Sequence, residues 1–334
     1  MSSLFRPGQV LRGRWGRYTI TQEIHQTVWF ARNLAGETVV IKSVRGHPRV
    51  ENERDILKRF QARTPYLRPL IDEITEPPDP PTIVLQYLED HLLNASRKKT
   101  LNRRELKYVS RRVLEALKVL HQEGFVHTDV KPDNILVNYR EGEIRFSDVQ
   151  LSDLGGTSPA DGPAARAGTP IGAPIWTSPE VLMETPWNSA TDIWSFGAVL
   201  ISLIYGGNFN LFRPRHVACG HEEYGLEVLK QQFRYFGPFP AKYEEIARPP
   251  TIAAILYLMD TIPPAHTTPF HRTTATEVGL ADKEFLGKIM QLDWRDRPTA
   301  AVLLEDEWFT DDGRVHQAGP YTSPCSKSRV SPSH

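Results

Sequence analysis

The spacing of apolar residues changes about a quarter of the way along the chain. Before Leu88 they alternate with polar residues or form short β-branched runs, which is typical of strands. Further on, apolar side chains recur at intervals of three and four from Leu106 to Leu120, as the buried face of a helix requires. Strands are predicted at residues 18–23, 27–33, 37–44 and 82–88. We therefore predict an α+β protein with a small β-rich part over residues 18–88 and a larger helical part over residues 89–309.

The two ends of the chain depart from this pattern. Residues 1–17 form a lead-in with four arginines and no acidic residue, which we interpret as a solvated basic tail rather than an arm that contacts nucleic acid. Residues 310–334 are polar and are predicted to be disordered. Two Ser-Pro pairs in this last segment, at Ser323 and Ser331, are candidate phosphorylation sites.

Composition narrows the class of protein without naming an activity. Forty basic and forty acidic side chains leave a formal net charge of zero, so nothing indicates nucleic acid or an anionic membrane as the main partner. Two cysteines are too few for a disulfide framework, and no apolar run approaches the ~20 residues of a membrane span. The first seventeen residues hold no signal-peptide core. We expect a soluble intracellular protein, cytoplasmic or nuclear.

The strongest chemical signal is the octad from His127 to Asn134, which lies between two aliphatic runs. It holds the carboxylate of Asp129, the amine of Lys131 and the carboxamide of Asn134 within six positions. Asp129 can orient a substrate hydroxyl and take up its proton, and Lys131 can neutralise charge on a moving phosphoryl group. Asn134 offers an oxygen to a divalent cation. The combination indicates phosphoryl transfer.

Two charged residues upstream of the octad fit the same chemistry. Lys42 follows the run Thr38 to Ile41, which has the β-branched residues of a buried strand and so directs one amine into a cleft. Glu53 begins a helical pattern in which Ile56, Leu57 and Phe60 share one face.

Two aspartates downstream of Asn134 compete for the role of second metal ligand. Asp153 ends an alternating run over residues 149–155, and Gly155 then permits a sharp turn. Asp148 also ends an alternating run, over residues 143–147, and lies closer to Asn134 in the sequence. We favour Asp153, because no glycine follows Asp148 and residues 138–142 then form a lengthened hairpin turn.

Together these residues resemble the motifs of protein kinases, in the order of that family. The octad resembles the catalytic loop, with the Asp-x-Lys spacing of the serine/threonine branch, and Asp153-Leu154-Gly155 is similar to Asp-Phe-Gly. Ser178-Pro179-Glu180 is similar to the Ala-Pro-Glu that closes the activation segment. Residues 127–129 and 235–240 also loosely resemble the CMGC group and its SR-protein kinases.

The resemblance implies a bilobal protein-kinase fold, with ATP and Mg²⁺ as cofactors and the serine or threonine of a protein as substrate. It implies that Glu53 holds the Lys42 amine against the nucleotide phosphates and that Asn134 and Asp153 bind the metal. The residues expected to enclose the adenine base are Val28 and Val40 above, Leu136 beneath and Leu88 in the hinge, whose backbone over residues 85–89 pairs with the base edge.

The same resemblance implies two structural contacts in the helical part. Arg297 is expected to pair with Glu180, since either charge alone would be costly to bury. Asp192, in the run Asp192 to Gly197, is expected to accept hydrogen bonds from the backbone of the catalytic loop.

Three departures bear on activity. Residues 22–28, where the family has its phosphate-covering loop, contain no glycine. Losing two charge-assisted backbone hydrogen bonds, at roughly 1.5–3 kcal/mol each, lowers nucleotide affinity about a hundredfold or more. Thr128 replaces the arginine that usually pairs with a phosphorylated activation loop. Ala173 replaces a threonine that usually contacts the catalytic aspartate, which weakens the assignment of substrate class.

Three hypotheses follow. The first is an active, slow serine/threonine protein kinase, because Lys42, Glu53, Asp129, Asn134 and Asp153 are all present. The second is a pseudokinase that acts as a binding scaffold, favoured by the glycine-free loop. The third is a small-molecule phosphotransferase, against which Arg297 and residues 178–180 argue. We favour the first.

Overall fold

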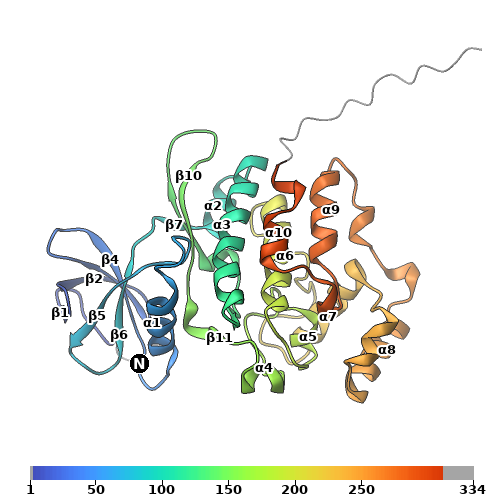
Figure 1. Cartoon of the computed structure of the whole chain (residues 1–334), viewed down its shortest axis with the longest axis horizontal. Coiled ribbons are helices and arrows are strands. Elements are labelled where there is room, and N and C mark those ends of the chain that lie inside the picture. The colour runs from blue at the N-terminus through green and yellow to red at the C-terminus, as the bar shows by residue number, and fades with distance from the viewer. Residues whose placement is uncertain (1–2, 311–334) are drawn as a thin grey trace, which may run out of the picture.

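Six antiparallel strands at the N-terminal end close into a barrel in the order β1-β2-β3-β4-β6-β5 (Figure 1). The computed structural model describes residues 3–310. Buried apolar side chains, among them Trp29, Ile41 and Val84, fill the barrel. The strands are β1 (Val10–Gly13), β2 (Arg17–His25), β3 (Val28–Arg32), β4 (Thr38–Ser43), β5 (Leu70–Glu76) and β6 (Thr82–Gln86).

The described part of the lead-in, residues 3–17, contributes strand β1 to this barrel, so the prediction of a solvated tail is wrong for these residues. Strand β1 pairs with β2 and β5, and Phe5 and Leu11 are buried. The Phe5 ring contacts the Trp29 ring edge to face, with centroids 5.0 Å apart. The arginines stay exposed, and Arg12 pairs with Glu76 at 3.3 Å. Burial of the two apolar side chains therefore outweighs the local basic composition.

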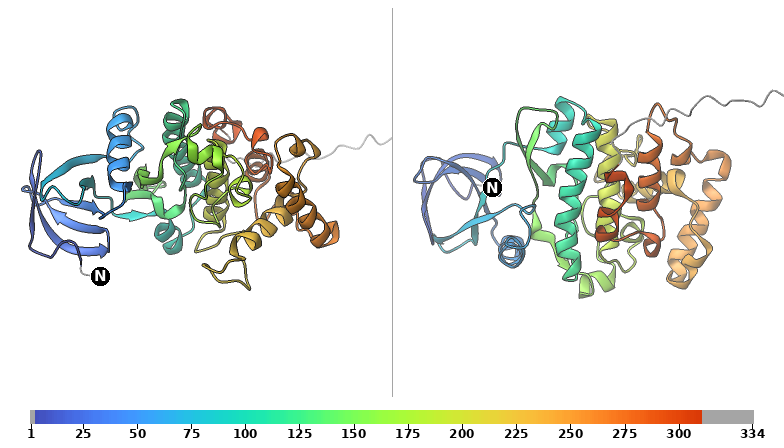
Figure 2. Two further views of the ribbon diagram at one scale, coloured as in Figure 1. Left: turned by 90° about the horizontal axis from the view of Figure 1, so that it is seen from below. Right: turned by 45° about the horizontal axis from the view of Figure 1, so that its top comes forward.

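Helix α1 (Arg49–Phe60) lies on the side of the barrel that faces the helical part (Figures 1 and 2). Its buried residues include Glu53, Ile56, Leu57 and Phe60, as the sequence pattern predicts. The side chain of Asn52 donates hydrogen bonds to the carbonyl oxygens of Gly155 (3.1 Å) and Thr157 (2.9 Å). These bonds attach α1 to the segment that begins at Asp153.

The helical part is built on α3 (Arg103–Gln122) and α6 (Ala190–Tyr205), which pack against each other. A capping box between Asn102 and Glu105 starts α3, and its buried face contains the residues of the predicted three-four pattern. The remaining helices are α2 (Leu92–Lys98), α4 (Pro163–Ala167), α5 (Pro179–Leu182), α7 (Tyr224–Phe236), α8 (Pro249–Thr261), α9 (Leu280–Ile289) and α10 (Ala300–Leu304).

A small sheet connects the barrel to these helices. Strand β9 (Ile135–Tyr139) pairs with both β10 (Phe146–Leu151) and β7 (Asp90–His91), while β8 (Phe125–Val126) pairs with β11 (Ser158–Pro159). The sequence shows two alternating runs, which end at Asp148 and Asp153, but the structure forms one strand, β10, with Asp148 inside it. A bulge between Phe146 and Asp148 explains the broken alternation.

No helix between residues 3 and 310 is both long enough and apolar enough to cross a membrane. The predicted disordered tail lies outside the described residues except for Thr310.

Candidate active site

The structure brings together the three polar residues of the octad. The loop leaves β8, passes through a short 3₁₀ helix (Pro132–Asn134) and enters β9. The Asp129 Oδ2 atom accepts hydrogen bonds from Lys131 Nζ (2.7 Å) and Asn134 Nδ2 (2.9 Å). The same Nδ2 donates to the Asp129 carbonyl oxygen at 2.8 Å, which turns the amide oxygen of Asn134 away from Asp129. One carboxylate is thus held between an ammonium and an amide.

Helix α6 holds the backbone that carries Asp129. The buried Asp192 carboxylate accepts hydrogen bonds from the backbone N–H groups of His127 (2.7 Å) and Thr128 (2.9 Å), as predicted. The ring of His127 is fully buried and its Nε2 contacts the carbonyl oxygen of Ser152 at 3.0 Å, so it braces the loop. Thr128 has a φ of 75°, a left-handed conformation that is strained for a β-branched residue.

Lys42 joins three elements of the site. Its Nζ lies 2.6 Å from Glu53 Oε2 on α1 and 2.6 Å from Asp153 Oδ1 after β10. Burial alone would lower the pKa of Lys42, but attraction to Glu53 and Asp153 outweighs burial and raises it. Burial alone would raise the pKa of Asp153, and attraction to Lys42 instead lowers it. Lys42 and Asp153 are therefore both charged at neutral pH.

Asp153, and not Asp148, is the carboxylate that reaches this cluster. Asp153 adopts the left-handed conformation (φ 60°, ψ 59°) immediately before a 3₁₀ helix, Leu154–Gly156. Asp148 is exposed on β10 and accepts hydrogen bonds from the side chains of Asn138 (3.1 Å) and Ser147 (2.8 Å). The glycine that follows Asp153 in the sequence favours the same residue. Metal binding by Asp153 and Asn134 stays a prediction.

The apolar residues assigned to the base come from three strands and the hinge. Val28 on β3 and Val40 on β4 are diagonal neighbours on one face, and Leu85 on β6 lies opposite Val40. Leu136 is half-buried on β9, and Leu88 is buried after β6. Their contact with a base stays a prediction.

The glycine-free loop is a tight hairpin. Strand β2 extends to His25, β3 begins at Val28, and only Gln26 and Thr27 form the turn. The side chains from Thr21 to Gln26 are exposed. The register shifts twice between the two strands, which marks irregular pairing without glycine.

Arg68 also lies in this region, although no sequence motif predicted it as a residue of the site. It lies between α1 and β5, and its Nε donates a 2.8 Å hydrogen bond to the carbonyl oxygen of Gln86, inside the predicted hinge. Burial lowers the pKa of Arg68 to about 10, partly offset by Glu53 and Asp153. The available signal was a cation between the apolar residues Leu67 and Pro69.

The segment after Asp153 is fixed at both ends. The Thr128 hydroxyl donates to the Gly156 carbonyl oxygen at 3.1 Å. Gly172 has a φ of 65°, and a Cβ there would lie 2.8 Å from the Thr128 carbonyl oxygen, so only glycine fits this close approach to Asp129. At the far end, Arg297 donates to Glu180 through both Nη1 (2.7 Å) and Nη2 (2.8 Å), which confirms the predicted pair.

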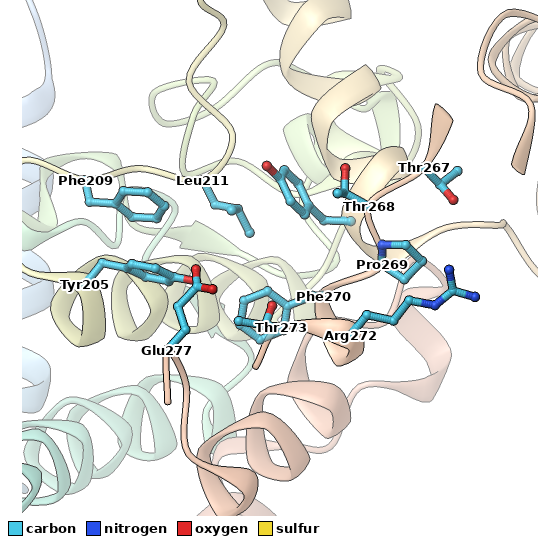
Figure 3. Close-up of a pocket in the computed structure, with 11 residues that line it drawn as sticks. Tyr205, Phe209, Leu211, Thr267, Thr268, Pro269, Phe270, Arg272, Thr273 and Glu277 are labelled. Atoms are coloured by element: carbon cyan, nitrogen blue, oxygen red, sulfur yellow. The ribbon is translucent and has the colours of Figure 1, made fainter. Parts of the chain in front are cut away.

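A separate pocket of about 430 Å³ lies at the other end of α6. Figure 3 shows the stacked rings of Tyr205 and Phe209, whose centroids are 4.1 Å apart, on one side of it. The Tyr205 hydroxyl donates to Glu277 at 2.7 Å. Asp192 and Tyr205 are thirteen residues apart on α6, or about 20 Å along the axis, so this pocket is not part of the octad's site.

Two relatives that the chain matches are named as serine/threonine-protein kinases. The chain is 33% identical over 198 residues to serine/threonine-protein kinase nekl-2 of Caenorhabditis elegans, an alignment that covers 53% of each protein. It is 26% identical over 232 residues to serine/threonine-protein kinase PAK 4 of Mus musculus, covering 69% of this chain and 31% of that protein. The chain therefore spans about half or less of these relatives' lengths.

A solved structure shows the same fold. A chain in the crystal structure of the yeast RNA Pol II CTD kinase CTDK-1 complex superposes with a TM-score of 0.69 at 18% identity, covering 88% of this chain and 93% of that one. The predicted bilobal kinase fold is thus confirmed. The protein kinase domain model matches residues 27–309, most of the sequence and all the residues of the site. The chain belongs to the protein kinase family.

Proposed function

We propose that this chain is a serine/threonine protein kinase that transfers the terminal phosphoryl group of a nucleoside triphosphate, ATP in the family, to a protein hydroxyl. The observation that carries the proposal is the bridge by Lys42 between Glu53 and Asp153, 2.6 Å from each. This bridge needs α1, β4 and the segment after β10 to be in register at once. In the kinases that the chain resembles, these groups hold the nucleotide phosphates and the metal.

The donor atoms suit Mg²⁺ and a triphosphate. Magnesium is usually bound by one or two protein carboxylates together with substrate phosphates and water. Asp153 supplies a carboxylate with a lowered pKa, and Asn134 supplies an amide oxygen directed away from Asp129. Among residues 3–310 no group of three His, Cys, Asp or Glu side chains is placed to hold a metal alone, which fits a shared site. When bound, the ion would neutralise phosphate charge.

Asp129 and Lys131 supply the chemistry of the protein itself. Asp129 keeps Oδ1 for a substrate hydroxyl while Lys131 and Asn134 occupy Oδ2. It can orient that hydroxyl and accept its proton as the new O–P bond forms. The Lys131 ammonium, 2.7 Å from Asp129, is placed to stabilise negative charge on the transferred group.

A second function, a pseudokinase scaffold, is favoured by one observation. The β2–β3 hairpin has no glycine, and Glu23 adds a carboxylate on the strand that should cover phosphates. Both features weaken nucleotide binding. A place near the CMGC kinases, inferred from residues 127–129 and 235–240, stays a prediction, as does a serine or threonine substrate in view of Ala173.

The test is phosphoryl transfer by the purified chain to itself or to a generic basic protein. Magnesium and a mixture of γ-labelled ATP and GTP are supplied, so that the result does not depend on the base. We expect slow incorporation that Asp129→Asn lowers at least about a hundredfold, the usual contribution of a positioned base. Asp161→Asn, at a side chain 88% exposed, is the matched control and should retain the signal. If neither wild type nor Asp129→Asn incorporated labelled phosphate, the scaffold function would be favoured.

A further inference from the structure

Arg68 is anchored by its backbone beside the strand that leads to Asp153. Its N–H donates to the Leu151 carbonyl oxygen at 2.9 Å, and the Leu151 N–H donates to the Tyr66 carbonyl oxygen at 2.7 Å. Leu67 and Leu151 form a parallel bridge. The Arg68 side chain therefore starts from a fixed backbone position beside the end of β10.

From there the Arg68 side chain reaches the backbone of the hinge, residues 85–89. Its Nε donates to the Gln86 carbonyl oxygen, and the Gln86 N–H is bonded to the Pro69 carbonyl oxygen at 3.0 Å. Both backbone groups of Gln86 thus have partners. The next hinge groups, the N–H and C=O of Leu88, have no hydrogen bond to any residue between 3 and 310.

Two nitrogens of the Arg68 guanidinium have N–H donors that no described residue accepts. Nη1 and Nη2 of Arg68 make no hydrogen bond to any residue between 3 and 310, while Nε is engaged. Glu53 and Asp153 are close enough to stabilise the cation, but no carboxylate lies within ion-pair distance of it in the described part of the chain. With a pKa of about 10 the group is charged at neutral pH. Two cations, Lys42 and Arg68, therefore balance these two carboxylates.

A purine base bound at the hinge would present its 6- and 7-positions to the Nη1 and Nη2 donors of Arg68. Adenine presents an amino donor at position 6 and an acceptor at N7, whereas guanine presents two acceptors, O6 and N7. Arginine pairs with O6 and N7 of guanine through two donors, and this is its commonest specific contact with a base. Against adenine, one Arg68 donor would face the amino group, which is itself a donor, so only N7 could accept from the guanidinium.

We propose that Arg68 selects the base of the nucleotide bound at the candidate active site, favouring a purine with an oxygen at position 6, guanine or hypoxanthine, over adenine. The inference rests on the proposed function, because it assumes that the kinase cleft binds a purine triphosphate. Arg68 binds the base and touches no reacting atom, so it determines specificity and not the rate of proton transfer. The free C=O of Leu88 is available to the N1–H that such a base carries.

The test is a comparison of dissociation constants by calorimetry, in the presence of magnesium. The probes are the β,γ-imido analogues of ATP and GTP, with ITP added because it carries O6 without the 2-amino group of guanine. We expect wild type to bind the guanine analogue and ITP about tenfold or more tightly than the adenine analogue. Arg68→Met, which keeps the length and removes the donors, should reduce this ratio at least about tenfold. Arg104→Met, at an exposed arginine of α3, should leave it unchanged.

The outcomes separate this inference from the kinase proposal. Tighter binding of the adenine analogue by wild type, or the same ratio in Arg68→Met, overturns base selection and leaves phosphoryl transfer to its own test. No binding of any probe by wild type also overturns it. If Arg68→Met fails to fold, the wild-type ranking decides alone. Guanine binding without phosphoryl transfer would support base selection and count against catalysis.

Discussion

Asp192 on α6 holds Thr128 in a left-handed backbone conformation by accepting the hydrogen bond of its N–H group at 2.9 Å. The other carboxylate oxygen accepts the His127 N–H at 2.7 Å and contacts His121 Nε2 at 2.9 Å. A left-handed β-branched residue costs of order 1–3 kcal/mol and persists only where its surroundings enforce it. The position of Asp129, one residue further on, therefore depends on a carboxylate from another helix.

Replacement of this carboxylate should affect both stability and activity. Asp192→Asn directs an amide N–H₂ at one of the two backbone donors, so at least one charge-assisted hydrogen bond is lost. We expect the free energy of unfolding to fall by about 2–4 kcal/mol in urea titrations. Phosphoryl transfer should fall further than stability accounts for, because Thr128 is released. Asp161→Asn is the exposed control, and an equally small loss in both variants would contradict this role.

The Glu180–Arg297 pair predicts a different kind of dependence. Both side chains are almost fully buried, and the guanidinium also donates to the carbonyl oxygens of Gln291 (2.8 Å) and Ala190 (3.0 Å). Removing Arg297 leaves a buried carboxylate, so Arg297→Met should cost about 3–5 kcal/mol. The double variant Glu180→Leu/Arg297→Met removes both charges and should recover part of that loss.

Denaturant titration of the two variants checks this expectation. Arg166→Met, which breaks a contact between side chains 74% and 88% exposed, is the control and should change stability by less than about 0.5 kcal/mol. If the double variant were as unstable as Arg297→Met, apolar contact would not replace the ion pair.

Motif spacing predicted the site better than it predicted the sheet. Lys42, Asp129, Asn134 and Asp153 could be found because phosphoryl transfer demands those residue types in that order, whatever surrounds them. Strand β5 was not predicted, since Asp72 and other acids interrupt its apolar pattern.

Long-range partners explain what local patterns missed. The buried Asp72 carboxylate accepts hydrogen bonds from the backbone of Arg14 and Trp15 and from the Tyr18 hydroxyl, all more than fifty residues away. Strand β1 depends on the same contacts. Arg68 was missed for a related reason, because its partner is a backbone carbonyl eighteen residues further on and leaves no mark in the sequence.

The β2–β3 hairpin offers the last prediction. Glu23 and Gln26 lie where the strand pair should cover the phosphates, and neither residue lets the backbone N–H groups approach an anion as glycine does. The double variant Glu23→Gly/Gln26→Gly removes one negative charge and restores that freedom. We expect nucleotide affinity to rise about tenfold, the value of one added charge-assisted hydrogen bond of about 1.5 kcal/mol.

The gain should carry a cost in stability that can be measured separately. The glycine at position 23 lies inside β2 and destabilises the fold by roughly 0.5–1 kcal/mol, so the melting temperature without nucleotide should fall. With saturating magnesium and nucleotide the shift in melting temperature should exceed that of wild type, since a ligand that binds only the folded state stabilises it in proportion to the logarithm of its affinity. Glu37→Gly, at an exposed position immediately before β4 and away from the hairpin, is the control for the effect of an added glycine elsewhere. Unchanged affinity in the double variant would show that the missing glycines are not what limits nucleotide binding, and would move attention to the hinge occupied by Arg68.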